Sequence, residues 1–216
     1  MTEFSNDNAL KSLYDDYRSL IENDLKPDNA GGYRFVWGFG NVNADVVLIG
    51  EAPGRDEVEQ GRPFVGKAGH ILDEFLEKTA INREELFITN TIKYRLARVR
   101  KGYEGVDNAS IPNSLLSNRP AGSDEIKTGA KLLRDEISII KPRVTVTMGN
   151  VPLKAMLIGT DVAGTIGDLH GRPINVNGCV LFPIYHPASL IYNRALAGEY
   201  EKDLERLKGI ISSKGE

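Results

Sequence analysis

The stretch Val46–Gly54 reads V-V-L-I-G-E-A-P-G, so that an apolar, β-branched run leads directly into a turn rich in glycine and proline. A short apolar run bounded by turn residues is typical of a buried β-strand. Three further runs of this kind follow at Leu86–Thr89, Val144–Met148 and Val180–Ile184. The sequence therefore predicts four buried strands.

Segments with helical periodicity lie before, between and after these strands. They cover Leu10–Ile21, Ala68–Lys78, Ser123–Ile140, Asn150–Leu157 and most of Ala188–Ile211. Strands that alternate with helices favour a parallel sheet covered by helices on both faces. The predicted fold class is α/β, a three-layer αβα arrangement around a central four-stranded parallel sheet.

The segments that follow the four strands are predicted to meet. In sheets of this class ligands bind outside the carboxyl ends of the strands. Four segments fall at those ends: Gly50–Gly54, Asn90–Lys93, Gly149-Asn150 and His186-Pro187. The pattern predicts one site built from four loops.

The composition is that of a globular protein with a small acidic excess. Of 216 residues, 41% are hydrophobic and 26% are charged, and the formal net charge is -3. This length suits a single domain, 1–216, in which 1–40 form an N-terminal helical segment. Binding to nucleic acid would require a local basic patch. No apolar run reaches the roughly 18 residues of a membrane span, so we expect a cytoplasmic protein without membrane association.

Cysteine and histidine do not indicate a metal site. Cys179 is the single cysteine, and its apolar neighbours predict a small buried hydrophobe. One thiol forms no internal disulfide and no four-cysteine metal or cluster site. The three histidines, at 70, 170 and 186, do not form a metal-ligand pattern.

One segment, 96–117, has little periodicity and is predicted to be an inserted, mobile, basic loop. It carries Arg98 and Arg100, and no acidic residue of the segment comes before Glu104. Loops of this length are usually functional or disordered. Two interpretations remain open: the loop grips phosphates, or it is a solvated surface loop.

Four side chains near the strand ends have the chemistry of a site. The Glu51 carboxylate can orient or deprotonate a water, or it is a solvated or cap-forming glutamate. Phe64 lies on a loop, where it can stack on a base or anchor the loop. The Asn90 amide can read a pyrimidine edge, or it only makes a turn. His186 can donate a hydrogen bond to a charge forming on a leaving group, or it is structural.

Five motifs follow one another along the chain: G-E-A-P-G at 50–54, G-R-P-F-V-G-K-A-G at 61–69, I-T-N-T-I-K at 88–93, G-N at 149–150 and Y-H-P-A-S-L at 185–190. This series resembles family 4 uracil-DNA glycosylases, from about Val46 to Leu204. Asn118-Arg119-Pro120 also resembles the N-R-x-P segment of that family. Its members flip a uracil from DNA into a pocket and hydrolyse the N-glycosidic bond.

The resemblance implies roles for the matching residues. Phe64 would stack on the flipped base, and Asn90 would hydrogen-bond its Watson–Crick edge, selecting uracil over cytosine. His186 would hydrogen-bond the base O2 and stabilise the departing uracilate anion. Glu51 would position the attacking water.

The turn around that glutamate is implied to contact the base through Gly50 and Ala52. Other families carry an aspartate or asparagine where this chain has Ala52, so the activation of water is the open part of the mechanism. Gly149 and Asn150 would contact a phosphate through a helix N-terminus.

The segment after the histidine is implied to form the loop that wedges into the DNA stack. Ala188, Ser189, Leu190 and Ile191 would form it, with Leu190 as the candidate wedge. The alternative is that Leu190 packs in the core under the last helix. In the basic loop, Arg98 and Arg100 would contact DNA, but the loop lacks the histidine with which a related branch traps the sugar covalently, so that chemistry is not implied.

The chain departs from family 4 at its iron–sulfur cysteines. A family cysteine directly after the lysine of the third motif is replaced by Tyr94, and we expect no cluster and no other cofactor. The packing would be supplied by other groups, for which Tyr33, Phe35 and Trp37 are candidates.

The expected function is that of a monofunctional uracil-DNA glycosylase, a monomer that acts on uracil-containing DNA in base excision repair. Two alternatives remain: a protein of the same fold that binds DNA without catalysis, and a glycosylase for another deaminated base.

Overall fold

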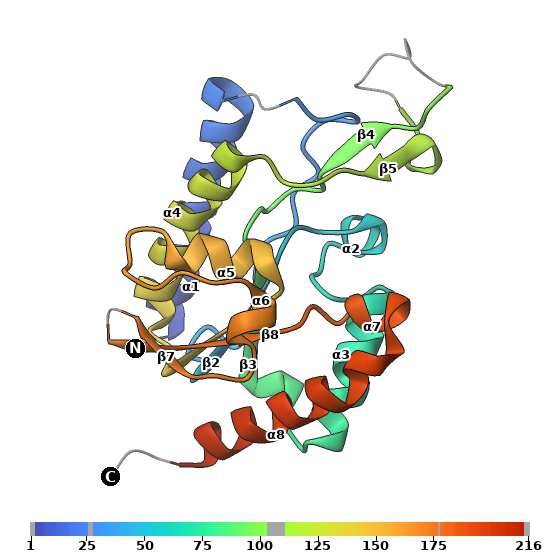
Figure 1. The fold of residues 1–216 in the computed structure, drawn as a ribbon. Helices are drawn as coiled ribbons and strands as arrows, with labels where there is room; N and C mark the ends of the chain where they lie inside the picture. Colours follow the sequence, from blue (N-terminus) through green and yellow to red (C-terminus); the bar gives the residue numbers. More distant parts are fainter. Residues whose placement is uncertain (1–2, 26–27, 103–110, 177, 214–216) are drawn as a thin grey trace.

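The computed structural model describes residues 3–25, 28–102, 111–176 and 178–213. Its centre is a six-stranded sheet with the strand order β1-β3-β2-β6-β8-β7 (Figure 1). The bounds are β1 Phe39–Gly40, β2 Val46–Gly50, β3 Leu86–Asn90, β6 Val144–Met148, β7 Ile174–Val176 and β8 Cys179–Ile184. The neighbours β3, β2, β6 and β8 are parallel, which confirms the predicted four-stranded parallel sheet.

The two edge strands of this sheet were not predicted. β1 pairs with β3 and β7 pairs with β8, both antiparallel. These strands have two and three residues, too few to show an alternation of apolar and polar side chains.

Helices cover both faces of the sheet, which confirms the three layers (Figure 1). On one face lie α1 Glu3–Ser19, α4 Ser123–Ile140 and α5 Asn150–Leu157, and on the other α3 Lys67–Lys78 and α8 Ala197–Ser212. Val47 and Ile49 of β2 pack with the first group, whereas Val46 and Leu48 pack with the second. Because alternate residues of a strand point to opposite faces, β2 belongs to both cores.

Shorter helices complete the described chain. They are the π-helix η1 Leu20–Leu25, α2 Arg55–Gln60, η2 Arg83–Glu85, η4 Asn113–Leu115, α6 Ile166–Leu169, α7 Ser189–Tyr192 and η5 Arg194–Leu196. The C-terminal segment predicted to be mostly helical therefore consists of α7, η5 and α8.

The prediction of a long loop over 96–117 was wrong for its two ends. β4 Ala97–Val99 pairs antiparallel with β5 Leu116–Asn118. A small core of its own holds this hairpin, formed by Ala30, Ala97, Ile111 and Leu116. These strands were not predicted because three residues are too few to show a periodic pattern. The middle of the predicted loop, 103–110, lies outside the described residues.

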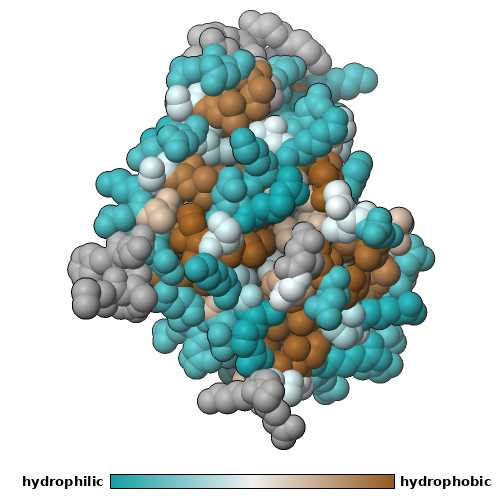
Figure 2. Space-filling view, turned by 90° about the vertical axis from the view of Figure 1, so that its left-hand side faces the viewer, coloured by the Kyte–Doolittle hydropathy of each residue, from teal (hydrophilic) through white to brown (hydrophobic). Residues whose placement is uncertain are grey.

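Figure 2 views the molecule from the left-hand side of Figure 1, the side of α1 and α4. Apolar side chains there form patches that polar side chains interrupt. A mixture of this kind is usual for a protein surface in water. Among the helices of the described chain, none is both long and apolar enough to cross a membrane.

A buried ion pair joins the end of β3 to α4. The Lys93 ammonium lies 2.6 Å from the Glu136 carboxylate, and the two side chains are 0% and 1% exposed. Tyr14 of α1 donates a hydrogen bond of 2.5 Å to the other oxygen of Glu136. The Lys93 ammonium also donates to the backbone carbonyl of Asn90, at 2.7 Å. Burial lowers the pKa of Lys93, and the nearby Glu136 opposes that shift.

Replacing Glu136 by glutamine should destabilise the protein strongly, because a buried ammonium then loses its counter-charge. We expect a loss of about 3–5 kcal/mol in the free energy of unfolding, measured by urea denaturation. Asp124→Asn is the matched control, since its pair with Lys127 is exposed and should contribute less than about 1 kcal/mol. Equal losses in the two variants would contradict the importance of the buried pair.

Candidate active site

A cavity of about 540 Å³ opens at the carboxyl ends of the parallel strands, and Ala52, Phe64, Asn90 and His186 are among the residues that line it. Two backbone hydrogen bonds continue the β2–β3 ladder beyond the strands, from the N–H of Thr91 to Gly50 and from Ile92 to Glu51. Three of the four segments predicted to converge therefore line one cavity. The fourth lies beside it, because a Cβ at Gly149 would be 3.2 Å from the Cβ of His186.

Phe64 is held in a conformation that is rare for a residue with a side chain, with a φ of 54°. The Arg83 guanidinium donates to the Phe64 carbonyl at 3.0 Å, and any side chain at Gly69 would collide with that carbonyl. The ring is buried, lines the cavity and lies 5.7 Å from the His186 ring. Both interpretations of Phe64 are thus compatible with its place, because it packs on the core and faces the cavity.

Asn90 stands next to Gly50, its register partner across the β2–β3 ladder. A Cβ at Gly50 would collide with the Asn90 amide oxygen and lie 2.7 Å from the Phe64 ring. Asn90 is 3% exposed and lines the cavity. Since no hydrogen bond joins this amide to another described residue, its donor and acceptor are available to a ligand.

His186 lines the cavity, and a backbone hydrogen bond defines the role of one of its ring nitrogens. Its Nδ1 accepts a hydrogen bond of 3.1 Å from the backbone N–H of Ala188. An accepting Nδ1 carries no proton, so the proton of the neutral ring lies on Nε2. Burial lowers the pKa of His186 to about 4. At neutral pH the ring is therefore uncharged and offers Nε2–H as a donor.

Glu51 lines a smaller adjoining cavity of about 260 Å³, which shares Ala52 and His186 with the first. Its carboxylate is half-buried, and burial raises its pKa, although a hydrogen bond from the Ala121 N–H opposes the shift. A carboxylate with a raised pKa is suited to accept a proton from water.

Tyr94 occupies the position where an iron–sulfur cysteine was expected in family 4, and aromatic rings surround it. Tyr33 and Phe35 contact its ring edge-on, with centroids 5.4 and 6.0 Å away. Trp37 stacks on Phe35 at 5.0 Å and on Tyr14 at 4.7 Å. The three candidates for this packing, Tyr33, Phe35 and Trp37, thus lie where the sequence predicted.

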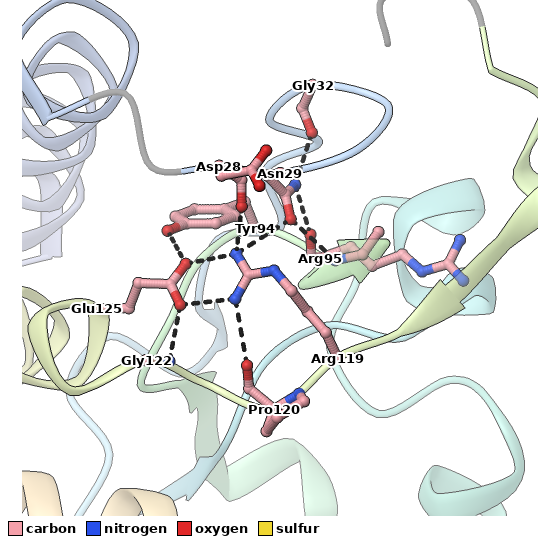
Figure 3. A network of polar contacts seen from close by, with 10 residues as sticks. Asp28, Asn29, Gly32, Tyr94, Arg95, Arg119, Pro120, Gly122 and Glu125 are labelled. Carbon is pink, nitrogen blue, oxygen red and sulfur yellow. Dashed lines mark hydrogen bonds and ion pairs between the residues drawn. The ribbon is translucent and has the colours of Figure 1, made fainter. Parts of the chain in front are cut away.

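The polar end of Tyr94 joins an ion pair (Figure 3). Its hydroxyl donates to Glu125 at 2.7 Å, and both terminal nitrogens of Arg119 donate to the same carboxylate at 2.7 Å. Cys179 is remote from this network, since it begins β8 and lies beside Thr145. The residues around Tyr94 therefore do not fit an iron–sulfur cluster.

Other predicted site residues lie around the cavity rather than in it. Leu190 packs in the main core and is 7% exposed. Of the two interpretations of Leu190, core packing therefore agrees with the structure. Ser189 is half-buried, and its N–H donates to the His186 carbonyl at 2.8 Å. Asn150 begins α5, and its side chain accepts from the Ile166 N–H at 2.8 Å.

The arginines of the hairpin separate into two environments. Arg98 and Arg100 are both exposed, but only Arg100 lines the cavity. Sequence reasoning counted Arg95 only among the basic residues around the loop and gave no role to Arg34. The Asn113 amide oxygen joins these two arginines, and the charge of Arg100 acts on Arg95. Sequence reasoning placed Ile191 in the wedge loop without choosing it as the wedge, and it missed Tyr192. These residues are 45% and 89% exposed on α7. Their consecutive positions after the histidine were the available signal.

Comparisons with known proteins give the family of the chain. The model of the uracil DNA glycosylase superfamily matches residues 37–208. The chain belongs to this superfamily. A type-4 uracil-DNA glycosylase of Pyrobaculum aerophilum is 34% identical over 183 residues, which are 81% of this chain and 82% of that protein. Proteins of the same name from Archaeoglobus fulgidus and Thermotoga maritima are 32% and 33% identical, over 83% of this chain and 83% and 84% of their own lengths.

Aromatic packing at Tyr94 predicts a fold that is independent of iron. Purified protein should lack the visible absorption of an iron–sulfur cluster, and a chelator should leave its Tm unchanged. Tyr94→Ala should lower the free energy of unfolding by about 3–5 kcal/mol, because it leaves a cavity among the rings. Stoichiometric iron in the purified protein, or a Tm that falls on chelation, would contradict this account.

Proposed function

We propose that this protein is a monofunctional uracil-DNA glycosylase of the family 4 type, which hydrolyses the N-glycosidic bond of uracil in DNA and leaves an abasic site. The observation that carries the proposal is the neutral His186, which offers Nε2–H to a cavity shared with Phe64 and Asn90. The names of the similar proteins support the same substrate.

Each group has one task in the proposed reaction. The flipped uracil stacks on Phe64, and the Asn90 amide hydrogen-bonds the base edge. As the glycosidic bond breaks, electrons move onto the base, and the Nε2–H of His186 donates a hydrogen bond to the O2 that gains negative charge. One donor held in place in this way lowers a barrier by about 3 kcal/mol.

Water attacks the sugar once the bond to the base weakens. Glu51 orients this water or takes its proton, because it is a carboxylate of raised pKa on a cavity that includes His186. Gly50 and Ala52 leave room for the base, and their turn contacts it through the backbone.

DNA around the flipped nucleotide would be held at the cavity rim. Gly149 and the start of α5 at Asn150 face a phosphate, and Ser189 places the loop that follows His186. Arg98 and Arg100 add positive charge on the hairpin. The proposed wedge is Ile191 with Tyr192 rather than Leu190, because an inserting side chain must be exposed before DNA binds.

Replacing His186 by alanine should lower the rate of uracil release roughly 100- to 1000-fold, since the oxyanion loses its donor. The measurement is single-turnover cleavage of a labelled single-stranded oligonucleotide with one uracil, followed by alkali, with thymine in place of uracil as the blank. His70→Ala is the matched control, because His70 is exposed on α3.

An unchanged rate in His186→Ala would refute the role of the histidine. If the wild-type protein releases no uracil from single strands or from a U:G duplex, the proposed activity falls. Release of another deaminated base would then identify a different substrate, and binding without any release would identify a DNA-binding protein.

Tyr192→Ala should slow uracil release from duplex DNA about tenfold and leave single-stranded DNA unaffected, because only a duplex must be unstacked before the base flips. The two rates are compared under single-turnover conditions, with Tyr33→Phe as a control for loss of an aromatic hydroxyl away from α7. Equal loss on both substrates would show that Tyr192 is not a wedge.

A further inference from the structure

Four arginines from separate parts of the chain meet at one end of the cavity, and we call them the arginine cluster: Arg34, Arg55, Arg95 and Arg100. The Asn113 amide oxygen accepts from Arg34 at 2.5 Å and from Arg95 at 3.2 Å. Arg55, Arg95, Arg100 and Asn113 all line the 540 Å³ cavity. Burial lowers the pKa of Arg95, and the charges of the other three arginines lower it further.

Carboxylates neutralise only part of this charge. Arg55 lies 3.2 Å from Asp56 and 4.0 Å from Glu59. Over the part of the chain that the structure describes, Arg34, Arg95 and Arg100 form no ion pair, and Glu59 is the only acidic group that raises the pKa of Arg95. Asn113, which holds two of the guanidinium groups, is neutral.

Arg95 is a nearly buried charge without a carboxylate partner among the described residues. It is 5% exposed. Its Nε donates to the Asn118 amide oxygen at 3.2 Å. Figure 3 shows its side chain extending away from the Arg119–Glu125 pair. Arg119 is thus neutralised inside the fold, whereas Arg95 is not. A buried charge is costly unless a counter-ion pairs with it, so the cluster is suited to an anionic ligand.

The position of the cluster indicates the kind of anion. Phe64, His186 and the arginines line the same cavity, so a ligand whose base stacks on Phe64 beside His186 can reach the arginines. The anion that accompanies a base in a DNA strand is the phosphodiester, and guanidinium groups bind phosphate oxygens through paired hydrogen bonds.

We propose that the arginine cluster binds a backbone phosphate of the uracil-containing strand beside the flipped nucleotide. Arg95 and Arg100 contact the phosphate from the cavity wall, and Arg34 adds charge behind them. This inference rests on the proposed function, because it assigns the strand in the cavity to DNA. It also explains how a protein of net charge -3 holds a polyanion.

The test measures salt dependence of binding rather than cleavage alone. Wild type, Arg100→Gln and Arg34→Gln are titrated with a fluorescent single-stranded oligonucleotide that carries a non-hydrolysable 2′-fluoro-deoxyuridine. For each lost phosphate contact, the slope of log K against log salt should become about 0.7 less negative. Arg100→Lys keeps the charge and should keep the slope.

Arg134→Gln is the matched control, because it removes one positive charge from an exposed position on α4. On a cleavable oligonucleotide, Arg100→Gln should raise KM several-fold and leave kcat unchanged, a split that a folding defect would not give. Slopes equal to that of Arg134→Gln, or a wild-type protein that does not bind the oligonucleotide, would overturn the phosphate site. Changed slopes without uracil release by wild type would retain the site and refute the proposed activity.

Discussion

The in-register pairing of β2 with β3 is the constraint on which the site depends. It places Gly50 beside Asn90, and hydrogen bonds from Thr91 and Ile92 continue the ladder into the loops that follow. A loop tied to a ladder cannot shift without breaking hydrogen bonds that are costly to leave unmade. The absence of a side chain at Gly50 then lets the Phe64 ring and the Asn90 amide approach one another. The sheet thus fixes the positions of Gly50 and Asn90 at the cavity.

A buried ion pair supports the end of β3. The Lys93 ammonium donates a hydrogen bond to the Asn90 carbonyl and forms an ion pair with Glu136. A buried pair of this kind contributes little net stability compared with an apolar core, but neither partner can be removed alone. It therefore connects the position of Asn90 to α1 and α4, through Tyr14 and Glu136. The same end of β3 leads to Tyr94, so one short segment carries the proposed base contact, the buried charge and the aromatic packing.

Sequence reasoning succeeded where the signal is local and failed where it depends on three-dimensional neighbours. The four central strands were evident because each is a continuous apolar run. The strands at the sheet edges and in the hairpin are too short to show periodicity. Leu190 illustrates a second limit, because a motif fixes the order of residues but not which of three consecutive side chains faces the core. Arg34 and Arg95 are separated by 61 positions along the chain, and only the fold brings them to the same amide of Asn113.

The hydrogen bond between Ala188 and His186 has a consequence for evolution. The group that fixes the tautomer of the ring is a main-chain N–H, not a side chain. Every amino acid except proline supplies that donor at position 188. The protonation pattern of the histidine is therefore insensitive to the side chain at position 188. Because Ala188 also lines the cavity, the size of that side chain is limited by the space for the ligand and not by the hydrogen bond.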